Sequence, residues 1–361
     1  MSASSITTET YAIRREKLRD RLRQMNIEAL LVSHAANRFY LSGFELHDPQ
    51  CNESAGMLLV TAKGRDILMT DSRYLDAARR LWPEEDILIY GARRHAEIAS
   101  FFKAMGVKEV TFESRAMSVD AHARYSDHMR LIPSLNLVEP LRLIKEPAEL
   151  AAMKRSAELN EKVFQRMPGL IVPGKTEKEL AWEFEKLFRE FGASELAFSP
   201  IVAVDENGAL PHAIPGDKAV TERCSVLVDM GGRFENYCSD QTRTFWAGGD
   251  PPAHFTRTLE LVQAAQQAAM DVIRPGLTFR EAYAAARGVF EKHGVEAAFT
   301  HALGHGIGLE THEPPSLNPN LDGALSPGMV VTVEPGLYYP EWGGVRWEHM
   351  VVVTEDGCRT L

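Results

Sequence analysis

Two patterns of apolar and polar positions alternate along the first 140 residues. Short apolar runs predict strands at Ala29–Val32, Met57–Val60, Ile67–Met69, Ile87–Tyr90 and Val110–Phe112. Charged stretches with apolar positions at helical spacing predict helices over residues 11–26, Tyr74–Leu81 and Ala96–Met105. Strands that alternate with helices indicate an α/β domain with at least partly parallel strands. We expect it to end near Pro140.

A domain boundary is predicted where a long charged helix begins. The helix should run from Ala148 to about Arg166, and Pro147 suits its first turn. A chain of 361 residues is long enough for two domains of ordinary size. We therefore divide it into an N-terminal domain (1–140), a linker (141–150) and a C-terminal domain (151–361).

The C-terminal part contains an internal repeat. The segment that begins at Ile171 recurs at Ile273, and 273 − 171 gives an offset of 102. Six positions find the same residue type at that offset: Pro173, Gly174, Thr176, Glu179, Phe188 and Gly192. In both copies Thr-x-x-Glu forms a capping box that starts a helix, and the glycine suits its C-terminal cap.

Each copy continues into an apolar run that ends in an acid. These runs are Ser225–Asp229 in the first copy and Met329–Glu334 in the second. The repeat predicts two related α+β halves around a pseudo-two-fold axis. The acids of the two halves should then converge between them.

A hairpin over Val226–Phe245 carries two of the candidate acids. Asp229 ends a strand-like run, and Asp240 follows after the turn-forming Gly231-Gly232. Two carboxylates brought to one point repel each other unless a cation lies between them.

Further candidate ligands lie in the second half. His305 stands among glycines in Gly304–Gly308, Glu334 ends its run before Pro335, and Glu348 lies within the apolar run Val345–Val353. A carboxylate in such a run costs several kcal/mol unless it is paired or binds a cation. Each acid alone is more often a cap, turn or ion-pair residue, and a lone histidine can be a core residue. The order and spacing of the whole set carry the prediction.

The charge of this set predicts a metal centre. Four carboxylates and one neutral imidazole carry about four negative charges, which two divalent cations would offset. Oxygen-dominated ligation favours Mn²⁺, with Fe²⁺, Co²⁺ and Zn²⁺ as alternatives. Such a centre can hold a hydroxide between the ions and polarise a carbonyl, which are the requirements of hydrolysis at neutral pH.

Composition excludes several other classes. A net charge of −10 and a pI near 5.7 argue against a nucleic-acid partner. No apolar run approaches the roughly 18 residues of a membrane span, and the N-terminus has no apolar leader, so we expect a cytoplasmic protein. The four cysteines are scattered without CxxC spacing, which argues against a disulfide framework or a structural zinc site.

At this point the sequence resembles the M24-type metallopeptidases with the pita-bread fold, namely methionine aminopeptidases, prolidases and aminopeptidase P. The resemblance lies in Asp229-Met-Gly, Ser239-Asp-Gln-Thr-Arg-Thr, Gly304-His-Gly-Ile-Gly-Leu-Glu-Thr-His-Glu, Val333-Glu-Pro-Gly-Leu-Tyr and Gly344-Val-Arg-Trp-Glu. Asn37–Phe44 and Asp71–Tyr74 resemble the creatinase-type N-terminal domain of the prolidase and aminopeptidase P branch. The resemblance implies a creatinase-like α/β domain followed by a pita-bread catalytic domain.

The family pattern assigns a role to each candidate. It implies that the metal ligands are Asp229, Asp240, His305, Glu334 and Glu348. Glu334 would also shuttle the proton, His212 would contact the substrate, and His312 would stabilise the oxyanion. His301 would shape the proline pocket and Arg346 would orient the site or the substrate. For His301 and Arg346, purely local hydrogen bonding is an equal alternative.

The chain departs from the family pattern at one clear point. The family commonly continues Glu-Asp after its last ligand, whereas here Glu348 is followed by His349. In a strand the two side chains point to opposite faces, so the ligand need not be affected. The loop Glu45–Ser54, with His47, Asp48, Cys51 and Asn52, is also unlike a generic connector and would tune specificity if a partner subunit brings it to the site.

The prediction is a dinuclear-metal hydrolase that cleaves Xaa-Pro bonds in dipeptides or at the N-terminus of short peptides. The family implies a homodimer with a small peptide as substrate. One alternative is a metal-dependent non-peptidase on the same fold, such as an ectoine-type hydrolase, a dimethylsulfoniopropionate lyase or a creatinase-like amidinohydrolase. The other is a binding protein built on an inactive peptidase, which usually lacks a ligand.

Overall fold

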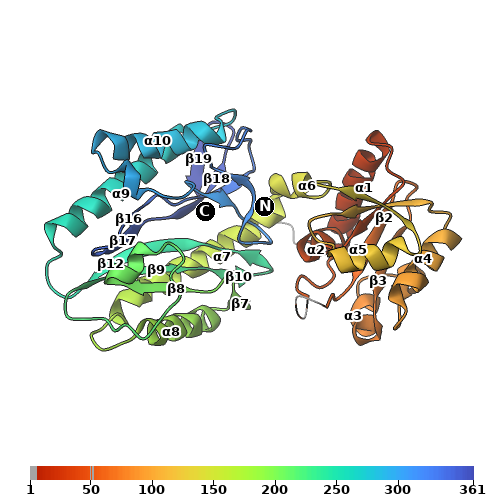
Figure 1. Ribbon diagram of the computed structural model, residues 1–361, viewed down its shortest axis with the longest axis horizontal. Helices are drawn as coiled ribbons and strands as arrows, with labels where there is room; N and C mark the ends of the chain where they lie inside the picture. Colours follow the sequence, from red (N-terminus) through yellow and green to blue (C-terminus); the bar gives the residue numbers. More distant parts are fainter. Residues whose placement is uncertain (1–5, 49, 51–52) are drawn as a thin grey trace. The chain divides into compact units, whose positions relative to one another are not determined.

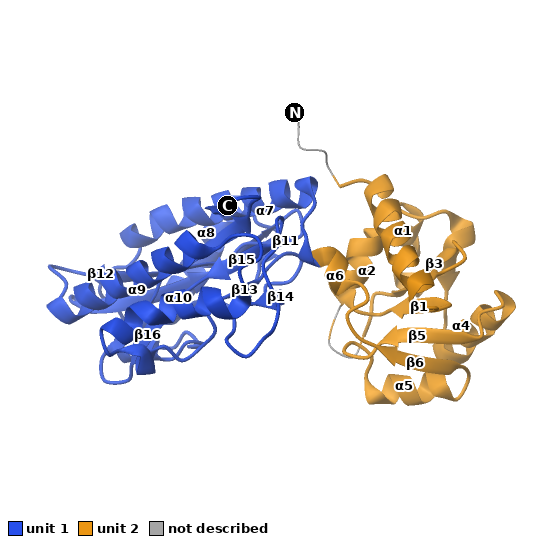
Figure 2. Ribbon diagram, turned by 90° about the horizontal axis from the view of Figure 1, so that it is seen from above, with its two compact units in different colours: residues 1–3, 143–361 blue, residues 4–142 orange. Residues whose placement is uncertain are grey.

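The computed structural model describes residues 6–48, 50 and 53–361, and it divides the chain into two compact units (Figure 2). One unit ends at Arg142 and the other runs from Leu143 to Leu361. Helix α6 (Glu139–Leu143) and helix α7 (Pro147–Arg166) occupy most of the stretch predicted as a linker. Residues 144–146 lie between the two helices.

The N-terminal unit is built around a six-stranded mixed sheet. Its strand order is β4-β3-β2-β1-β5-β6, and the bounds are β1 (Ala29–Val32), β2 (Met57–Thr61), β3 (Asp66–Thr70), β4 (Ile87–Ile89), β5 (Glu109–Glu113) and β6 (Arg130–Ser134). β1 pairs antiparallel with β2 and parallel with β5, which confirms the partly parallel sheet. The helices are α1 (Thr8–Gln24), α2 (Ala35–Ser42), α3 (Leu75–Arg79), α4 (Arg94–Ala104) and α5 (Val119–Ser126).

Helix α2 is an element that the apolar pattern did not predict. Its residues from Ala36 to Ser42 are all buried, Asn37 and Arg38 among them, so its polar positions do not mark a solvent-exposed face. Helix α1 begins at Thr8, three residues before the predicted start, with Thr7 as its N-cap. Strand β1 has the predicted bounds.

A buried arginine holds the segment around the loop Glu45–Ser54. Arg38 donates hydrogen bonds to Glu45 O and Gly56 O, both at 2.6 Å, and pairs with Asp48 at 3.0 Å. Asp48 also accepts a hydrogen bond from the backbone N–H of Ala55 at 2.9 Å. Cys51 and Asn52 lie outside the described residues.

The C-terminal unit packs its strands between helices (Figure 1). Besides α7, its helices are α8 (Glu177–Glu190), α9 (Ala253–Val272) and α10 (Phe279–Lys292). The strands of its first half are β7 (Glu195–Leu196), β8 (Ile201–Val204), β9 (Cys224–Met230), β10 (Gly232–Phe234), β11 (Tyr237–Cys238) and β12 (Gln241–Ala247). Those of its second half are β13 (His305–Gly306), β14 (Glu313–Ser316), β15 (Val330–Val333), β16 (Gly336–Tyr339), β17 (Gly343–Arg346), β18 (His349–Val353) and β19 (Cys358–Thr360).

The structure confirms the repeat. The hydroxyls of Thr176 and Thr278 each accept a hydrogen bond from the N3 backbone at 3.2 Å, so α8 and α10 begin with the same capping box. Gly192 and Gly294 follow these helices with φ of +103° and +67°. In the first half β9 lies between β8 and β12, and in the second β15 lies between β13 and β18.

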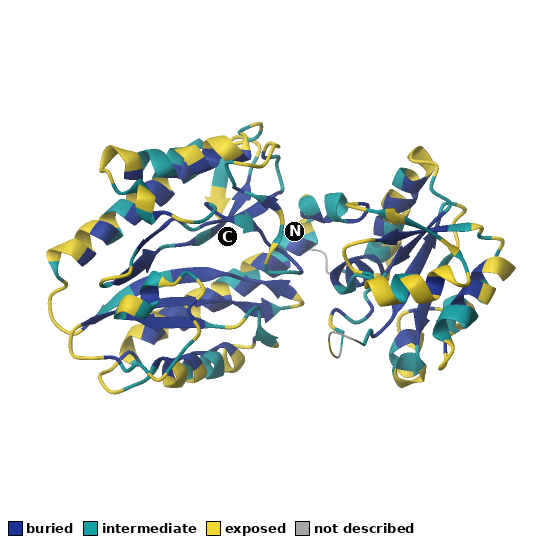
Figure 3. Ribbon diagram, in the orientation of Figure 1, coloured by how far each residue is buried: buried dark blue, intermediate teal, exposed yellow. Residues whose placement is uncertain are grey.

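Each half has its own apolar core. The central strands of each half are buried, and the helices expose one face to solvent (Figure 3). Cys224 and Cys238 are buried, and Cys358 is half-buried. Along the described part of the chain, no helix combines the length and apolarity needed to span a membrane.

Candidate metal centre and active site

Each half carries two of the candidate acids, at or near the ends of two paired strands. Asp229 lies in β9 opposite Thr242 of β12, and Asp240 immediately precedes β12, which confirms the predicted pair of strands. Glu334 immediately follows β15, and Glu348 immediately precedes β18. The Glu348 N–H donates to Thr242 O at 3.2 Å, so the halves meet at this point.

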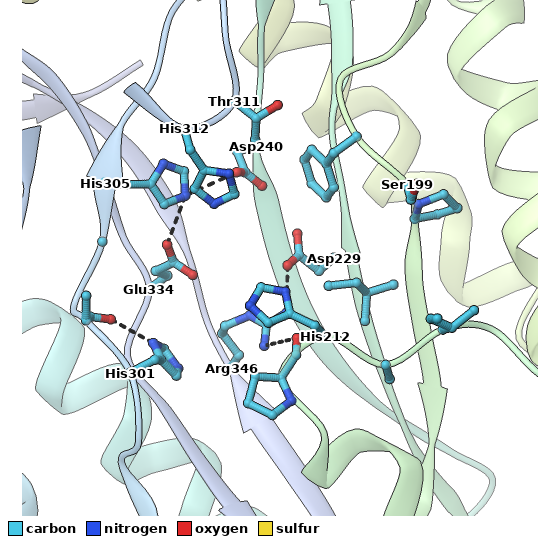
Figure 4. Close-up of a pocket in the computed structure, with 18 of the residues that line it drawn as sticks. Ser199, His212, Asp229, Asp240, His301, His305, Thr311, His312, Glu334 and Arg346 are labelled. Atoms are coloured by element: carbon cyan, nitrogen blue, oxygen red, sulfur yellow. Dashed lines mark hydrogen bonds and ion pairs between the residues drawn. The ribbon is translucent and has the colours of Figure 1, made fainter. Parts of the chain in front are cut away.

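The structure brings the five predicted ligands together. Ligand oxygens of Asp229, Asp240 and Glu348 all lie within 4.8 Å of one another. His305 Nε2 lies 3.7 Å from Asp240 Oδ2 and 3.2 Å from Glu334 Oε1. In Figure 4, His305 and Glu334 of the second half face Asp229 and Asp240 of the first half.

The clustered carboxylates are buried, and their hydrogen bonds leave some of their oxygen atoms without a partner among the described residues. Burial raises the pKa values of Asp240 and Glu348 well above the usual range, and the charges of neighbouring carboxylates raise them further. Asp229 Oδ1, Asp240 Oδ1 and Glu348 Oε1 have no hydrogen-bond partner among the described residues. Three unpartnered oxygens on clustered carboxylates fit divalent cations, which bind several carboxylate oxygens at once.

His305 and Glu334 form the other part of the cluster. Burial opposes ionisation of Glu334, but the hydrogen bond with His305 together with the charges of His305, His301 and Arg346 outweighs it and lowers the pKa to about 2. Thr332 Oγ1 also donates to Glu334 Oε1 at 2.9 Å. His305 Nδ1 lies 3.1 Å from Gly306 O, which can only accept, so Nδ1 carries a proton. His305 Nε2 faces the carboxylates, where it hydrogen-bonds to Glu334 while protonated and can bind a metal ion once that proton is lost.

A glycine brings His305 within reach of Glu334. A Cβ on Gly304 would lie 2.0 Å from Thr332 O, closer than any side chain permits. Only glycine therefore lets this backbone approach β15 so closely. The glycines around His305 were weak evidence in the sequence. The close contact of Gly304 with Thr332 gives a steric reason for one of them.

Arg346 is the centre of a hydrogen-bond network beneath the acids. It donates to Asp229 Oδ2 at 2.6 Å, to Thr242 Oγ1 at 3.1 Å and to the Tyr338 hydroxyl at 2.8 Å. Thr242 Oγ1 in turn donates to Glu348 Oε2 at 2.7 Å. Arg346 thus orients an acid of each half, one directly and one through Thr242.

Tyr338 and Thr242 were missed by the sequence analysis. Thr242 lies two residues after Asp240, on the same face of the strand, and this alternation is the signal that could have found it. Tyr338 stands in an apolar run and gives no comparable signal.

His301 lies at the end of the same network. Its Nδ1 donates to Ala302 O at 2.7 Å, so Nε2 accepts from the Tyr338 hydroxyl at 2.8 Å. Burial lowers the pKa of His301, which keeps the ring neutral. Hydrogen bonds thus run from Arg346 through Tyr338 to His301, and both readings of these two residues stay predictions.

A cavity of about 480 Å³ opens onto this site. Of the predicted residues it is lined by Asp229, Asp240, Glu334, His212, His301, His305, His312 and Arg346. The ring centroids of His305 and His312 are 4.0 Å apart, and burial lowers the pKa of His312. Phe198, Ile201 and Ile214 give the cavity an apolar wall. We call it the front cavity.

The side chains of His349 and Glu348 have different hydrogen-bond partners. The amide of Gln266 donates to Val333 O at 2.7 Å, so its oxygen accepts from His349 Nδ1 at 3.0 Å. His349 Nε2 then accepts from Arg243 at 2.9 Å. Burial and the Arg243 charge lower the pKa of His349 to about 4, so the ring is a neutral link between α9 and β12.

A buried ion pair lies next to His312 in the sequence. Lys145 Nζ lies 2.7 Å from Glu313 Oε1, and the two side chains are 1% and 4% exposed. Glu313 begins β14, which pairs with the β13 strand that carries His305. The segment before α7 is thus tied to the strand beside the site.

Comparisons with known proteins agree with this geometry. The profile of Metallopeptidase family M24 matches residues 151–355, and that of the Creatinase/Prolidase N-terminal domain matches residues 14–144. The uncharacterized peptidase YqhT of Bacillus subtilis is 35% identical over 349 residues, which is 96% of each chain. The solved Xaa-Pro dipeptidase from Bacillus anthracis has a TM-score of 0.90 and 34% identity, and covers 97% of both chains. The X-Pro aminopeptidase from Thermotoga maritima has a TM-score of 0.87 and 30% identity, and covers 96% of both chains. The chain therefore belongs to metallopeptidase family M24 and carries the N-terminal domain of the creatinases and prolidases.

Proposed function

We propose that this protein is a dinuclear-metal hydrolase that cleaves Xaa-Pro bonds in dipeptides or at the N-terminus of short peptides. The observation that carries the proposal is the set of three unpartnered carboxylate oxygens, on Asp229, Asp240 and Glu348, beside His305 and Glu334. The names of the similar dipeptidase and aminopeptidase support the substrate class.

The donor set suggests the cofactor. Four carboxylates and one imidazole favour two Mn²⁺ ions over softer cations, with Co²⁺, Zn²⁺ or Fe²⁺ as alternatives. When bound, such ions supply a water nucleophile at neutral pH and polarise the scissile carbonyl.

Glu334 and His312 have the properties that the reaction needs. Glu334 lines the front cavity beside His305, and as a carboxylate it can accept the proton of the attacking water. The same carboxylate can then deliver that proton to the prolyl nitrogen. His312 lines the front cavity as a neutral ring and can donate an N–H to the carbonyl oxygen as negative charge develops there.

The front cavity suits a substrate that contains proline. A prolyl amide has no N–H, so recognition depends on packing of the ring and on the charged ends of the peptide. Phe198, Ile201 and Ile214 offer apolar surface, and His212 and His301 line the same cavity. Its volume of about 480 Å³ is in the range of small-ligand sites.

A dipeptide and tripeptide panel with metal reconstitution tests the proposal. We expect chelated protein to be inactive on Ala-Pro and Leu-Pro, and Mn²⁺ to restore activity with two ions per chain. Undiminished activity after chelation would contradict the metal mechanism. Turnover of ectoine-type or sulfonium substrates without dipeptide cleavage would favour a non-peptidase, and well below one ion per chain would favour a binding protein.

We further propose that the protein acts as a homodimer in the cytoplasm. Both parts of this proposal rest on the family resemblance. Size-exclusion chromatography with light scattering tests the oligomeric state, and a mass of one chain would contradict the dimer. Cell fractionation tests the location.

A further inference from the structure

A second cavity, which we call the back cavity, reaches the same acids. It has a volume of about 500 Å³ and is lined by residues of α7, β12 and β18. Asp229 lines the front cavity, Glu348 lines the back cavity, and Asp240 lines both. The carboxylate cluster therefore lies between the two cavities.

The two acids that line the back cavity have oxygen atoms without a hydrogen-bond partner among the described residues. Asp240 and Glu348 are only 7% and 1% exposed, yet Asp240 Oδ1 and Glu348 Oε1 have no hydrogen-bond partner in the described part of the chain. These are the two clustered acids that line the back cavity. A cation that arrived through it would meet unsatisfied ligand oxygens as it reached the cluster.

The entrance of the back cavity carries further acids. Glu158 and Glu161 are exposed on α7 and line it, whereas Lys162 is the exposed cation among them. Arg243 also lines it and stays charged at neutral pH, because burial lowers its pKa only to about 10, so four acids face two cations in this lining. Carboxylates at a concave entrance raise the local concentration of cations and their rate of entry.

We propose that the back cavity is the route by which hydrated divalent cations and water reach the carboxylate cluster. Metal exchange then does not require the substrate cavity to be empty. The proposal rests on the proposed metal dependence and assigns separate entrances to metal and peptide. The front cavity is lined by the substrate-facing histidines and an apolar wall, and the back cavity by glutamates and amides.

Two tryptophan substitutions, one in each cavity, test the route. Ala157 is half-buried on α7 and lines the back cavity, and the 88% exposed Ile214 lines the front cavity. Mn²⁺-loaded protein is mixed with excess chelator, desalted at timed intervals and assayed for bound metal. We expect Ala157→Trp to slow Mn²⁺ release at least tenfold. Ile214→Trp should release Mn²⁺ at the native rate and raise KM for Leu-Pro.

The opposite pattern would overturn the route. It would appear as Mn²⁺ release at the native rate from Ala157→Trp, or as Mn²⁺ release slower than native from Ile214→Trp. If Ala157→Trp does not fold, the exposed pair Glu158→Lys and Glu161→Lys replaces it. We expect this double variant to take up Mn²⁺ several-fold more slowly at low salt, with the difference lost at high salt. Uptake at the native rate at low salt counts against the route. Mn²⁺ binding without peptidase activity contradicts the proposed function alone, whereas failure to bind Mn²⁺ contradicts both.

Discussion

The two halves of the catalytic unit share a scaffold but differ in chemistry. Each begins its helix with the same capping box, at Thr176 and Thr278, and ends it with a left-handed glycine. The strands of the first half contribute two short acids, Asp229 and Asp240. The strands and loops of the second half contribute longer and more varied side chains. These are His301, His305, His312, Glu334, Tyr338, Arg346 and Glu348.

This difference separates two kinds of position. Residues that the halves share stabilise the fold, because they satisfy helix ends that occur in both copies. Residues that the halves do not share lie around the acids, and we propose that they carry the chemistry. Substitutions at shared positions should lower stability and spare activity, and those at unshared positions should do the reverse.

The largest effect is expected when one acid of each half is neutralised. Asp240→Asn and Glu348→Gln should each lower kcat/KM on Leu-Pro at least about 10³-fold, which corresponds to about 4 kcal/mol of transition-state stabilisation. Bound Mn²⁺ should fall in parallel. A large loss from only one of the two variants would show that the halves do not share the centre equally.

In the metal-free protein, the same two variants should increase thermal stability at neutral pH. Burial and neighbouring charges raise the pKa values of Asp240 and Glu348, so the folded state binds protons that the unfolded state releases above about pH 4. The metal-free native protein should lose stability as the pH rises from about 4 through the raised values. Asp240→Asn and Glu348→Gln should lose less, and their Tm in chelator at pH 7 should exceed the native one. Parallel curves of Tm against pH would contradict this.

Histidines from the two halves should affect different kinetic constants. His312→Ala should lower kcat about 10²–10³-fold, the usual cost of one oxyanion donor, with Mn²⁺ content unchanged. His212→Ala should mainly raise KM, because its assigned role is to contact the substrate. The sharpest contradiction would be a kcat loss of equal size from both variants in steady-state kinetics.

Two threonines allow a matched comparison of support for the ligands. Thr242 Oγ1 donates to Glu348, and Thr332 Oγ1 donates to Glu334. The isosteric Thr242→Val and Thr332→Val should each weaken Mn²⁺ binding about 10–100-fold, because groups behind a ligand orient it. Metal titration measures the effect. A native Mn²⁺ affinity in either variant would show that its threonine does not support the neighbouring ligand.

The smallest effect is expected at the shared caps. Thr176→Ala and Thr278→Ala should each cost about 1 kcal/mol of unfolding free energy and leave kcat/KM within about twofold of the native value. Denaturant titration and the dipeptide assay measure the two quantities. A large activity loss at Thr278 alone would show that the scaffold is not equivalent in the two halves.

Local signals made much of this molecule predictable. Apolar runs located β1 with its bounds, and Thr-x-x-Glu at one offset identified two equivalent helices. The acids stood out because a carboxylate at the end of a buried strand is costly. Helix α2 was missed because its polar residues Asn37 and Arg38 are buried and do not mark a solvent-exposed face.

Contacts over long distances in the sequence set the limit of prediction. Arg346 reaches Asp229 across 117 positions, and no local pattern states that these two residues meet. The same holds for His349, whose partners Gln266 and Arg243 lie on a helix and a strand far away in the sequence. Packing of the whole unit decides such partners, so family resemblance could name Arg346 but not its contacts.

The Lys145–Glu313 pair bears on how the catalytic unit can be isolated by truncation. The family profile matches from residue 151, but Lys145 lies six positions earlier and pairs with a carboxylate inside the unit. Removing one partner of a buried pair typically costs about 3–5 kcal/mol. A shortened chain that begins at residue 151 therefore loses the ion pair beside His312, and the smallest independently folding catalytic fragment should include Lys145.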